Sequence, residues 1–338
     1  MVKKITYPKY TSKRTLPKNF KESDKQIFYS EFNKKFPGSY TIIKKNVKIL
    51  NLNLSKYNNL FSYTEHTKMS KYSIKDNLKN FKNSNFSADI PKKNIAIIEK
   101  GSWIVDEKSF HYFHWMCDAL PRLLQIIRYV DEFPVLLPSS FTRYSYIIET
   151  LETLNINYII YEDSQKYLVK NLLISSHVAS SGNFNKENII ELSRKLQCNQ
   201  NEIGKKIWVS RKLSKHRKIS NENELYQILK KYNYDIVYPE KLSFKEQVNL
   251  FSNTKVIAGL HGGGLTNMLF MKKNSIVFEL RRENDNVNNC YFSLASELDL
   301  KYYYSLETKL DDDLYVGDVH VNVDNFRSIL DMIEDEIL

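Results

Sequence analysis

The sequence predicts an α/β fold in which a parallel sheet is built from strands that alternate with helices. Apolar runs typical of buried strands alternate along the chain with segments whose apolar residues recur at helical spacing. The stretch from Lys255 to Arg282 reads as strand, glycine turn, helix and strand. A length of 338 residues is enough for two domains with separate cores.

The composition is that of a globular and strongly basic protein. Hydrophobic residues make up 42% of the chain and the formal net charge is +11. This charge suits a nucleotide sugar, a charged polysaccharide, an anionic membrane surface or nucleic acid, although no recognised nucleic-acid module is present. A general bias toward Lys and Asn explains it equally well. Three scattered cysteines indicate neither a disulfide framework nor a metal site. Because no apolar run has the length of a membrane span and no N-terminal apolar core follows the first lysines, we expect a cytoplasmic protein.

The N-terminal half predicts an arm, a long loop and a first series of elements. Residues 1–37 are basic and poor in aliphatic clusters, so we expect a partly ordered lead-in arm. Residues 55–93 are dense in Asn, Lys and Ser and are expected to be mostly loop. Strands are predicted at 41–54, 94–98, 134–137, 158–161 and 167–175, and helices at 109–130, 144–154 and 187–196. A polar stretch that ends at Gly204 indicates a domain boundary.

The helix predicted for residues 109–130 carries a candidate general base. His114, Asp118 and Arg122 are four residues apart and share one helix face. Pro121 interrupts the helical hydrogen bonds, so we expect a kink or a restart near Asp118. A carboxylate beside a histidine can act as a general base while the histidine holds its geometry. A plain helical ion pair explains the same spacing. The histidines lack the HExxH spacing of a zinc site.

The C-terminal half predicts a second series of strands and helices. Asn221 with Glu224, and Ser243 with Glu246, have the spacing of helix N-caps with capping boxes. Predicted strands lie at 207–209, 235–238, 256–258, 275–278 and 301–304, and predicted helices begin after the two caps, at 288–298 and around 326–333. Because ligands bind at the carboxyl ends of parallel strands, we expect the site where these strands end.

The glycine turn is the strongest candidate for a ligand site. Four of the nine glycines lie between Gly259 and Gly264. Glycine lets the backbone approach a ligand closely, and a helix N-terminus offers unpaired N–H groups to phosphate. His261 can donate to the same phosphate. The dinucleotide fingerprint would need a third glycine at Asn267, the Gly-x-Ser-x-Gly elbow of lipases is absent, and a tight turn without a ligand is the remaining alternative. We interpret the turn as a nucleotide-diphosphate site.

Basic residues near the turn are the candidate phosphate ligands. Arg211 follows a strand of the same predicted sheet, and a charge-assisted contact to phosphate there is worth roughly 1.5–3 kcal/mol. Arg217 is a second candidate and Arg281 also falls at a strand end. The neighbouring lysines Lys212, Lys215 and Lys218 are expected to be solvated. The acidic run Asp311–Asp313 has an Asp-x-Asp spacing that occurs in metal-using sugar transferases, but it is also expected to be solvated.

Three segments together resemble glycosyltransferase family 61. The segments WVSRKLSKHRKISNENEL and VYPEKLSFKEQVNLFSNTKVIAGLHGGGLTNMLFMKKNSIVFEL are similar to the C-terminal half of that family, and HYFHWMCDALPRLL to its upstream helix motif. The resemblance implies a bacterial-type enzyme of capsule or surface polysaccharide synthesis with GT-B architecture, in which two Rossmann-like domains face a cleft. The implied organisation is an arm at 1–37, an acceptor domain at 38–200, a nucleotide-sugar domain at 201–320 and a C-terminal helix at 321–338.

The resemblance also implies roles for individual residues. Asp118 would be the catalytic base and His114 its neighbour. The donor diphosphate would bind Arg211, Arg217, His261 and the amides of Gly262, Gly263 and Gly264, and the nucleotide pocket would be shaped by Asn267 and Glu279. Relatives often have Ala in place of Gly263. They also often have Asn where this chain has His111, which leaves the acceptor side open.

The function expected from these residues is inverting, metal-independent sugar transfer without a cofactor. The donor would be a nucleotide sugar, with a UDP-sugar expected, and the acceptor a glycan or lipid-linked glycan, reached in peripheral contact with the inner face of the membrane. Nucleic acid is not expected as a partner. Domain closure would bring the base to the donor. The alternatives are a sugar-phosphate or polyol-phosphate transferase and a non-enzymatic glycan- or polyanion-binding protein.

Overall fold

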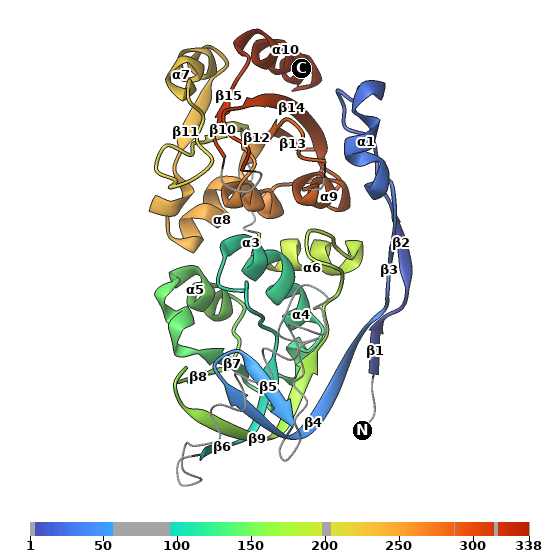
Figure 1. The fold of residues 1–338 in the computed structure, drawn as a ribbon, viewed down its shortest axis with the longest axis vertical. Coiled ribbons are helices and arrows are strands. Elements are labelled where there is room, and N and C mark those ends of the chain that lie inside the picture. The colour runs from blue at the N-terminus through green and yellow to red at the C-terminus, as the bar shows by residue number, and fades with distance from the viewer. Residues whose placement is uncertain (1–3, 57–94, 198–203, 287, 314–316, 338) are drawn as a thin grey trace. The chain divides into compact units, whose positions relative to one another are not determined.

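The structure is a computed structural model of the chain (Figure 1). It describes residues 4–56, 95–197, 204–286, 288–313 and 317–337. The loop predicted for residues 55–93 and the polar stretch before Gly204 therefore lie almost entirely outside the described residues. In the described part of the chain, no helix is both long and apolar enough to cross a bilayer.

The chain folds into two compact units, and both are discontinuous in sequence. The first unit contains Met1–Tyr10 and Phe36–Ser181, and the second contains Thr11–Lys35 and Gly182–Leu338. Each combines helices with a sheet, so the α/β class is confirmed. The domain limits expected from the sequence, with a boundary between residues 200 and 201, stay a prediction.

The first unit contains a mixed sheet. Its strand order is β1-β4-β9-β6-β7-β8, with β5 paired to β4. Strand β4 runs antiparallel to its neighbours, whereas β9, β6, β7 and β8 pair in parallel. Strand β1 (Lys4–Tyr7) lies in the segment expected to be a lead-in arm. The other strands overlap the apolar runs predicted as strands: β4 (Ser39–Leu50), β5 (Asn53–Lys56), β6 (Ile95–Trp103), β7 (Val135–Pro138), β8 (Tyr158–Tyr161) and β9 (Lys166–Ser175).

The predicted kinked helix of the first unit contains a π turn. Its parts are α3 (Tyr112–His114), the π segment η6 (Trp115–Ala119) and α4 (Leu120–Leu124). The Leu120 N–H bonds to the Trp115 carbonyl five residues back, immediately before Pro121, which has no N–H to donate. The π turn therefore lets the helix continue up to and through Pro121. The other helices are η7 (Ile127–Tyr129), η8 (Ser139–Arg143) and α5 (Ser145–Thr153).

The second unit contains the parallel sheet that the sequence predicts. Its order is β11-β10-β12-β13-β14-β15, and only the short last strand pairs antiparallel among those described. The strands are β10 (Lys205–Val209), β11 (Tyr234–Val237), β12 (Thr254–Leu260), β13 (Ile276–Arg282), β14 (Lys301–Lys309) and β15 (Val319–His320).

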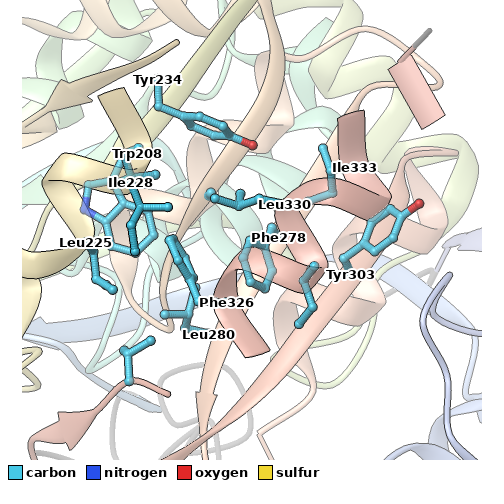
Figure 2. Close-up of a cluster of buried hydrophobic side chains, with 14 of the residues drawn as sticks. Trp208, Leu225, Ile228, Tyr234, Phe278, Leu280, Tyr303, Phe326, Leu330 and Ile333 are labelled. Atoms are coloured by element: carbon cyan, nitrogen blue, oxygen red, sulfur yellow. The ribbon is translucent and has the colours of Figure 1, made fainter. Parts of the chain in front are cut away.

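The period of two along these strands separates a core face from a site face. Trp208, Ala258 and Phe278 belong to a buried cluster with α7 (Glu222–Lys231) and α10 (Val323–Ile337) (Figure 2). Alternate residues such as Gly259 and Glu279 therefore lie on the opposite face. The remaining helices of this unit are α6 (Lys186–Leu196), η9 (Pro239–Lys241), α8 (Phe244–Ser252), the 3₁₀ helix η10 (Gly263–Phe270) and α9 (Cys290–Glu297).

One of the two predicted capping boxes is present. Ser243 accepts from the backbone N–H of Glu246, whose carboxylate accepts from the Ser243 N–H, at the start of α8. Asn221 makes no side-chain cap for α7. Its amide instead bonds both the N–H and the carbonyl of Val321, each at 3.0 Å. The prediction for α7 was wrong because a tertiary contact takes the capping side chain.

Residues 11–35 are a folded part of the second unit, where the sequence predicts a lead-in arm. Phe28 is fully buried, with its ring centroid 4.9 Å from those of Phe292 and Tyr304. The Arg14 guanidinium, also buried, forms ion pairs with Glu31 and Glu297. Aromatic burial and a paired arginine thus hold the segment. Its elements are β2 (Tyr10–Lys13), η1 (Glu22–Asp24), α1 (Lys25–Phe28), η2 (Tyr29–Glu31) and β3 (Asn33–Phe36).

Candidate active site

The glycine turn connects β12 to η10 as predicted. The strand ends at Leu260 and the helix begins at Gly263. The His261 N–H bonds to the Leu280 carbonyl of β13 at 2.9 Å, which fixes the start of the turn beside the neighbouring strand. The first N–H groups of a helix have no intrahelical acceptor, so those of Gly263 and Gly264 are available to an anion.

Other side chains approach two of the three consecutive glycines closely. A Cβ on Gly262 would lie 1.9 Å from the Arg211 Nη1, and a Cβ on Gly264 would lie 2.5 Å from the Val209 Cγ1. A Cβ on Gly263 would meet no atom within 4 Å. A Cβ therefore fits at Gly263 without any movement, whereas one at Gly262 would displace the Arg211 guanidinium and one at Gly264 would press on Val209.

Arg211 is held beside the turn by the basic loop that follows it. Its Nε donates to the Arg217 carbonyl at 2.7 Å, and its Nη2 donates to the Ser214 hydroxyl and the His216 carbonyl, both at 2.8 Å. Nη1, next to Gly262, has no hydrogen-bond partner among the described residues. One edge of a fixed guanidinium therefore remains for an anion.

The surroundings of Arg211 favour binding of a negative charge. Burial, and then the charge of Arg217, lower the pKa of Arg211 to about 10, so it stays protonated at neutral pH. Arg217 has a positive φ of 54°, which is uncommon for a residue with a Cβ and often occurs at functional loops. Its own Nε is buried without a partner in the described chain. An anion between the two guanidinium groups would relieve their repulsion.

His261 is oriented by a buried carboxylate. Its Nδ1 lies 2.5 Å from the Glu279 Oε1, and Tyr302 donates to the other Glu279 oxygen. Burial raises the pKa of Glu279, but His261, Arg281 and the Tyr302 hydroxyl outweigh it, so the pKa lies below its ordinary value. Glu279 is therefore ionised at neutral pH. With Nδ1 engaged, Nε2 is the His261 atom available to a ligand.

Three predicted residues lie behind the turn. Asn267 is fully buried and donates to the Gln247 Oε1 at 3.0 Å. Glu279 is also fully buried, so both can shape a pocket only through their neighbours. Arg281, expected at the strand end, is buried as well and donates to the Asn289 Oδ1 at 2.8 Å. It holds the loop after β13 and stabilises the Glu279 charge.

In the first unit, the predicted His114–Asp118 contact is present. The His114 Nδ1 lies 2.7 Å from the Asp118 Oδ2, and Asp118 is 5% exposed. Burial raises the pKa of Asp118 above its ordinary value, while the hydrogen bond and charge of His114 act against that rise. A carboxylate with a raised pKa is a better proton acceptor than an exposed one. Arg122 is buried close by, with its Nε donating to the Ser175 carbonyl at 2.9 Å.

The structure adds residues that the sequence did not single out. The Ser181 hydroxyl donates to the Asp118 Oδ2 at 2.9 Å. Asp106 is fully buried, and its charge acts on Asp118 and Arg122. Tyr291, at the start of α9, lies with its ring centroid 4.9 Å from that of His261. Asp106 could have been found as a carboxylate ending the apolar run WIVD, but nothing in the sequence marks Ser181 or Tyr291.

His111 lies at the surface beside the base. Its ring centroid is 6.1 Å from that of His114, and the residue is exposed. Burial of the ring, and then the charges of His114 and Lys108, lower the pKa of His111. It is therefore a mainly neutral imidazole at neutral pH.

The acidic run after β14 forms a turn. The Asp311 carboxylate accepts from the backbone N–H groups of Asp313 and Asp318 at 2.9 and 3.0 Å, and the run is exposed. Among the residues that the structure describes, no three His, Cys, Asp or Glu side chains come together as a metal site.

The fold is that of an α/β protein whose glycine turn leaves N–H groups and a guanidinium edge unused in the described part of the chain, and comparison with known proteins indicates the class. Residues 112–278 match the family model described as Glycosyltransferase 61. The match contains both the His114–Asp118 helix and the glycine turn. It supports the family and, with the relatives, a glycosyltransferase.

The similar proteins share one description, and each matches only part of this chain. The chain is similar to EGF domain-specific O-linked N-acetylglucosamine transferases, with 37% identity over 98 residues to the protein of Drosophila melanogaster and 40% over 86 residues to that of Gallus gallus. These matches cover 28% and 24% of this chain and only 18% and 16% of the two relatives. A match to the Xenopus laevis protein has 29% identity over 147 residues, or 40% of this chain and 27% of that protein.

Proposed function

We propose that the protein is an inverting, metal-independent glycosyltransferase of GT-B architecture that transfers a sugar from a UDP-sugar to a hydroxyl of a surface or capsular glycan. The observation that carries the proposal is the anion site of the second unit. Several groups there have no hydrogen-bond partner among the described residues: one guanidinium edge of Arg211, the amides of Gly263 and Gly264, and the His261 Nε2.

This site has the charge that the reaction needs. When the bond between the sugar and the nucleotide breaks, the departing diphosphate gains negative charge. An enzyme without a metal must balance that charge with cations and oriented N–H groups. Arg211 and Arg217 supply charge, and a doubly protonated His261, whose Nδ1–H donates to Glu279, supplies a directed Nε2–H donor.

Asp118 supplies the second half of the reaction. As the acceptor oxygen bonds to the anomeric carbon, its proton must leave, and the Asp118 carboxylate takes it. The raised pKa of Asp118 increases its basicity, and His114 holds the carboxylate in place. Attack on the face opposite the leaving group inverts the anomeric carbon.

The names of the relatives set the order in which substrates should be tested. They are N-acetylglucosamine transferases that act on EGF domains, so UDP-N-acetylglucosamine is the first donor to try. Acceptors should include surface glycans, a lipid-linked glycan and an EGF domain. The cytoplasmic location and the peripheral membrane contact expected from the sequence remain predictions.

The test begins with binding and ends with product analysis. Calorimetric titration with UDP should give a Kd that Arg211→Ala weakens about tenfold or more, and EDTA should leave transfer unchanged. Nuclear magnetic resonance of the product should show an inverted anomeric carbon. A product that gains phosphate would indicate a sugar-phosphate transferase. Absence of UDP binding, with tight salt-sensitive binding to polyanions, would indicate a binding protein and refute the proposal.

A further inference from the structure

The two hydrogen bonds of the Asp118 carboxylate fall on the same oxygen. The His114 Nδ1 lies 2.7 Å from Oδ2, and the Ser181 hydroxyl donates to Oδ2 at 2.9 Å. Within the part of the chain that the structure describes, Oδ1 has no hydrogen-bond partner. One carboxylate oxygen is therefore fixed by two donors, and the other is left with its lone pairs free to accept a proton.

We propose that Ser181 is a positioning residue for Asp118: with His114 it holds Oδ2 so that Oδ1 is presented to the acceptor hydroxyl. The inference rests on the proposed function, because it needs Asp118 to act as the base. It goes beyond that function by assigning a third residue to the base and by naming the oxygen that takes the proton.

The place of Ser181 in the chain suits this role. It is half-buried and follows the sheet strand β9, and its hydroxyl also lies 3.4 Å from the His114 Nδ1. The next residue, Gly182, has a φ of +79°, a conformation that a residue with a Cβ adopts only with strain. The chain direction directly after Ser181 therefore depends on a glycine, and the serine is held at a defined point of the backbone.

The charged groups around Asp118 explain why the hydrogen bond from Ser181 affects its pKa. Burial raises the pKa of Asp118, His114 lowers it, the charge of Asp106 raises it and the Ser181 hydrogen bond lowers it. Arg122 is the neighbouring cation, and Asp106 lies 3.4 Å from the His177 Nε2. Because burial and Asp106 both oppose ionisation, losing one of the two donors would leave a smaller fraction of the base ionised at neutral pH.

The chemical step keeps Ser181 out of the proton transfer. The acceptor hydroxyl gives its proton to the Asp118 Oδ1 as its oxygen bonds to the anomeric carbon, and the bond from that carbon to the diphosphate breaks with its electron pair. Ser181 neither gains nor loses a proton. Its loss should therefore reduce the rate of transfer without weakening the binding of the donor diphosphate.

The test compares five single variants of the full chain, Asp118→Asn among them, with the wild type, using UDP-N-acetylglucosamine and an active acceptor. Ser181→Ala should lower kcat about tenfold or more, since a hydrogen bond to a charged group is lost, with the donor KM unchanged. Its rate should also fall off at a higher pH on the acid side. Ser181→Thr should restore both values, and Ser181→Cys, which keeps the shape with a weaker donor, should lie between. Ser180→Ala, at an exposed neighbour, should match the wild type.

The outcomes separate this inference from the proposed function. Wild-type kcat and a wild-type acid limb in both Ser181→Ala and Ser181→Cys, with Asp118→Asn inactive, would overturn the role of Ser181 and leave the base assigned. Full activity in Asp118→Asn would overturn the base and, with it, the inference. If Ser181→Ala lowers kcat but does not move the acid limb, the residue has only a structural role and the inference fails.

Discussion

Replacing Gly262 by Ala tests whether Arg211 is the cation of the diphosphate site. The new Cβ would lie 1.9 Å from the Arg211 Nη1 and 2.9 Å from its Cζ. Both distances are far inside van der Waals contact, and both clashing atoms belong to a side chain that can move. We therefore expect the guanidinium to leave the turn and the protein to remain folded.

The magnitude follows from the contacts that Arg211 would lose. It would give up its bonds to the Arg217 carbonyl, the Ser214 hydroxyl and the His216 carbonyl, and with them its fixed position beside the turn. A charge-assisted hydrogen bond of this kind is worth roughly 1.5–3 kcal/mol, which corresponds to about 10- to 150-fold in affinity. Calorimetric titration with UDP measures this loss directly.

The matched control is the next glycine. Gly263→Ala places a methyl group where no atom lies within 4 Å, so its Kd for UDP should stay within about twofold of the wild-type value. Equal affinities for Gly262→Ala and Gly263→Ala, with both proteins folded, would refute the assignment of Arg211. A loss of UDP affinity in Gly263→Ala alone would show that the diphosphate contacts the backbone of the turn at Gly263 and does not depend on Arg211.

Three further outcomes are expected. Glu279→Gln removes the buried charge beside His261 and should weaken UDP binding about tenfold at neutral pH, whereas unchanged calorimetric Kd values would contradict the role of the pair. Phe28→Ala should lower the free energy of unfolding by about 3–5 kcal/mol in urea titrations, because it leaves a cavity in a buried aromatic cluster. A decrease below about 1 kcal/mol would indicate that residues 11–35 are a lead-in arm and not part of the core. Burial raises the pKa of Glu307 from 4.5 to about 7. Its ionised form therefore opposes folding, with no cost below pH 4.5 and a full cost of about 3 kcal/mol above pH 7. Glu307→Gln should accordingly raise the Tm at pH 8 but not at pH 4.5, and an equal Tm difference at both pH values would count against this assignment.

The sequence predicts those features whose cause is local. The strands, the glycine turn and the His114–Asp118 spacing each depend on neighbours within a few residues, and the structure has all three. The helical period placed the histidine and the carboxylate on one face, and the π turn before Pro121 did not separate them. The capping of α7 failed because Val321, 100 residues away, takes the Asn221 amide.

Features that depend on distant partners could not be predicted. Ser181 reaches Asp118 across 63 positions, and nothing near Ser181 distinguishes it from any other loop serine. Residues 11–35 look like a basic arm because their burial partners lie near the other end of the chain, as in the bond from Asn289 to the Ile27 carbonyl across 262 positions. Glu279 was expected to shape the nucleotide pocket, and only the structure shows that it is fully buried and contacts His261.

The division of the second unit between two distant segments has a consequence for how the protein is made. During synthesis, Phe28 leaves the ribosome long before its partners Phe292 and Tyr304 are made. Its apolar surface therefore stays exposed to solvent while the middle of the chain is translated. A fragment begun at Gly182 would expose the matching aromatic surface permanently. Expression of the second unit in isolation would therefore require residues 11–35 to be supplied, either fused through a linker or as a separate peptide.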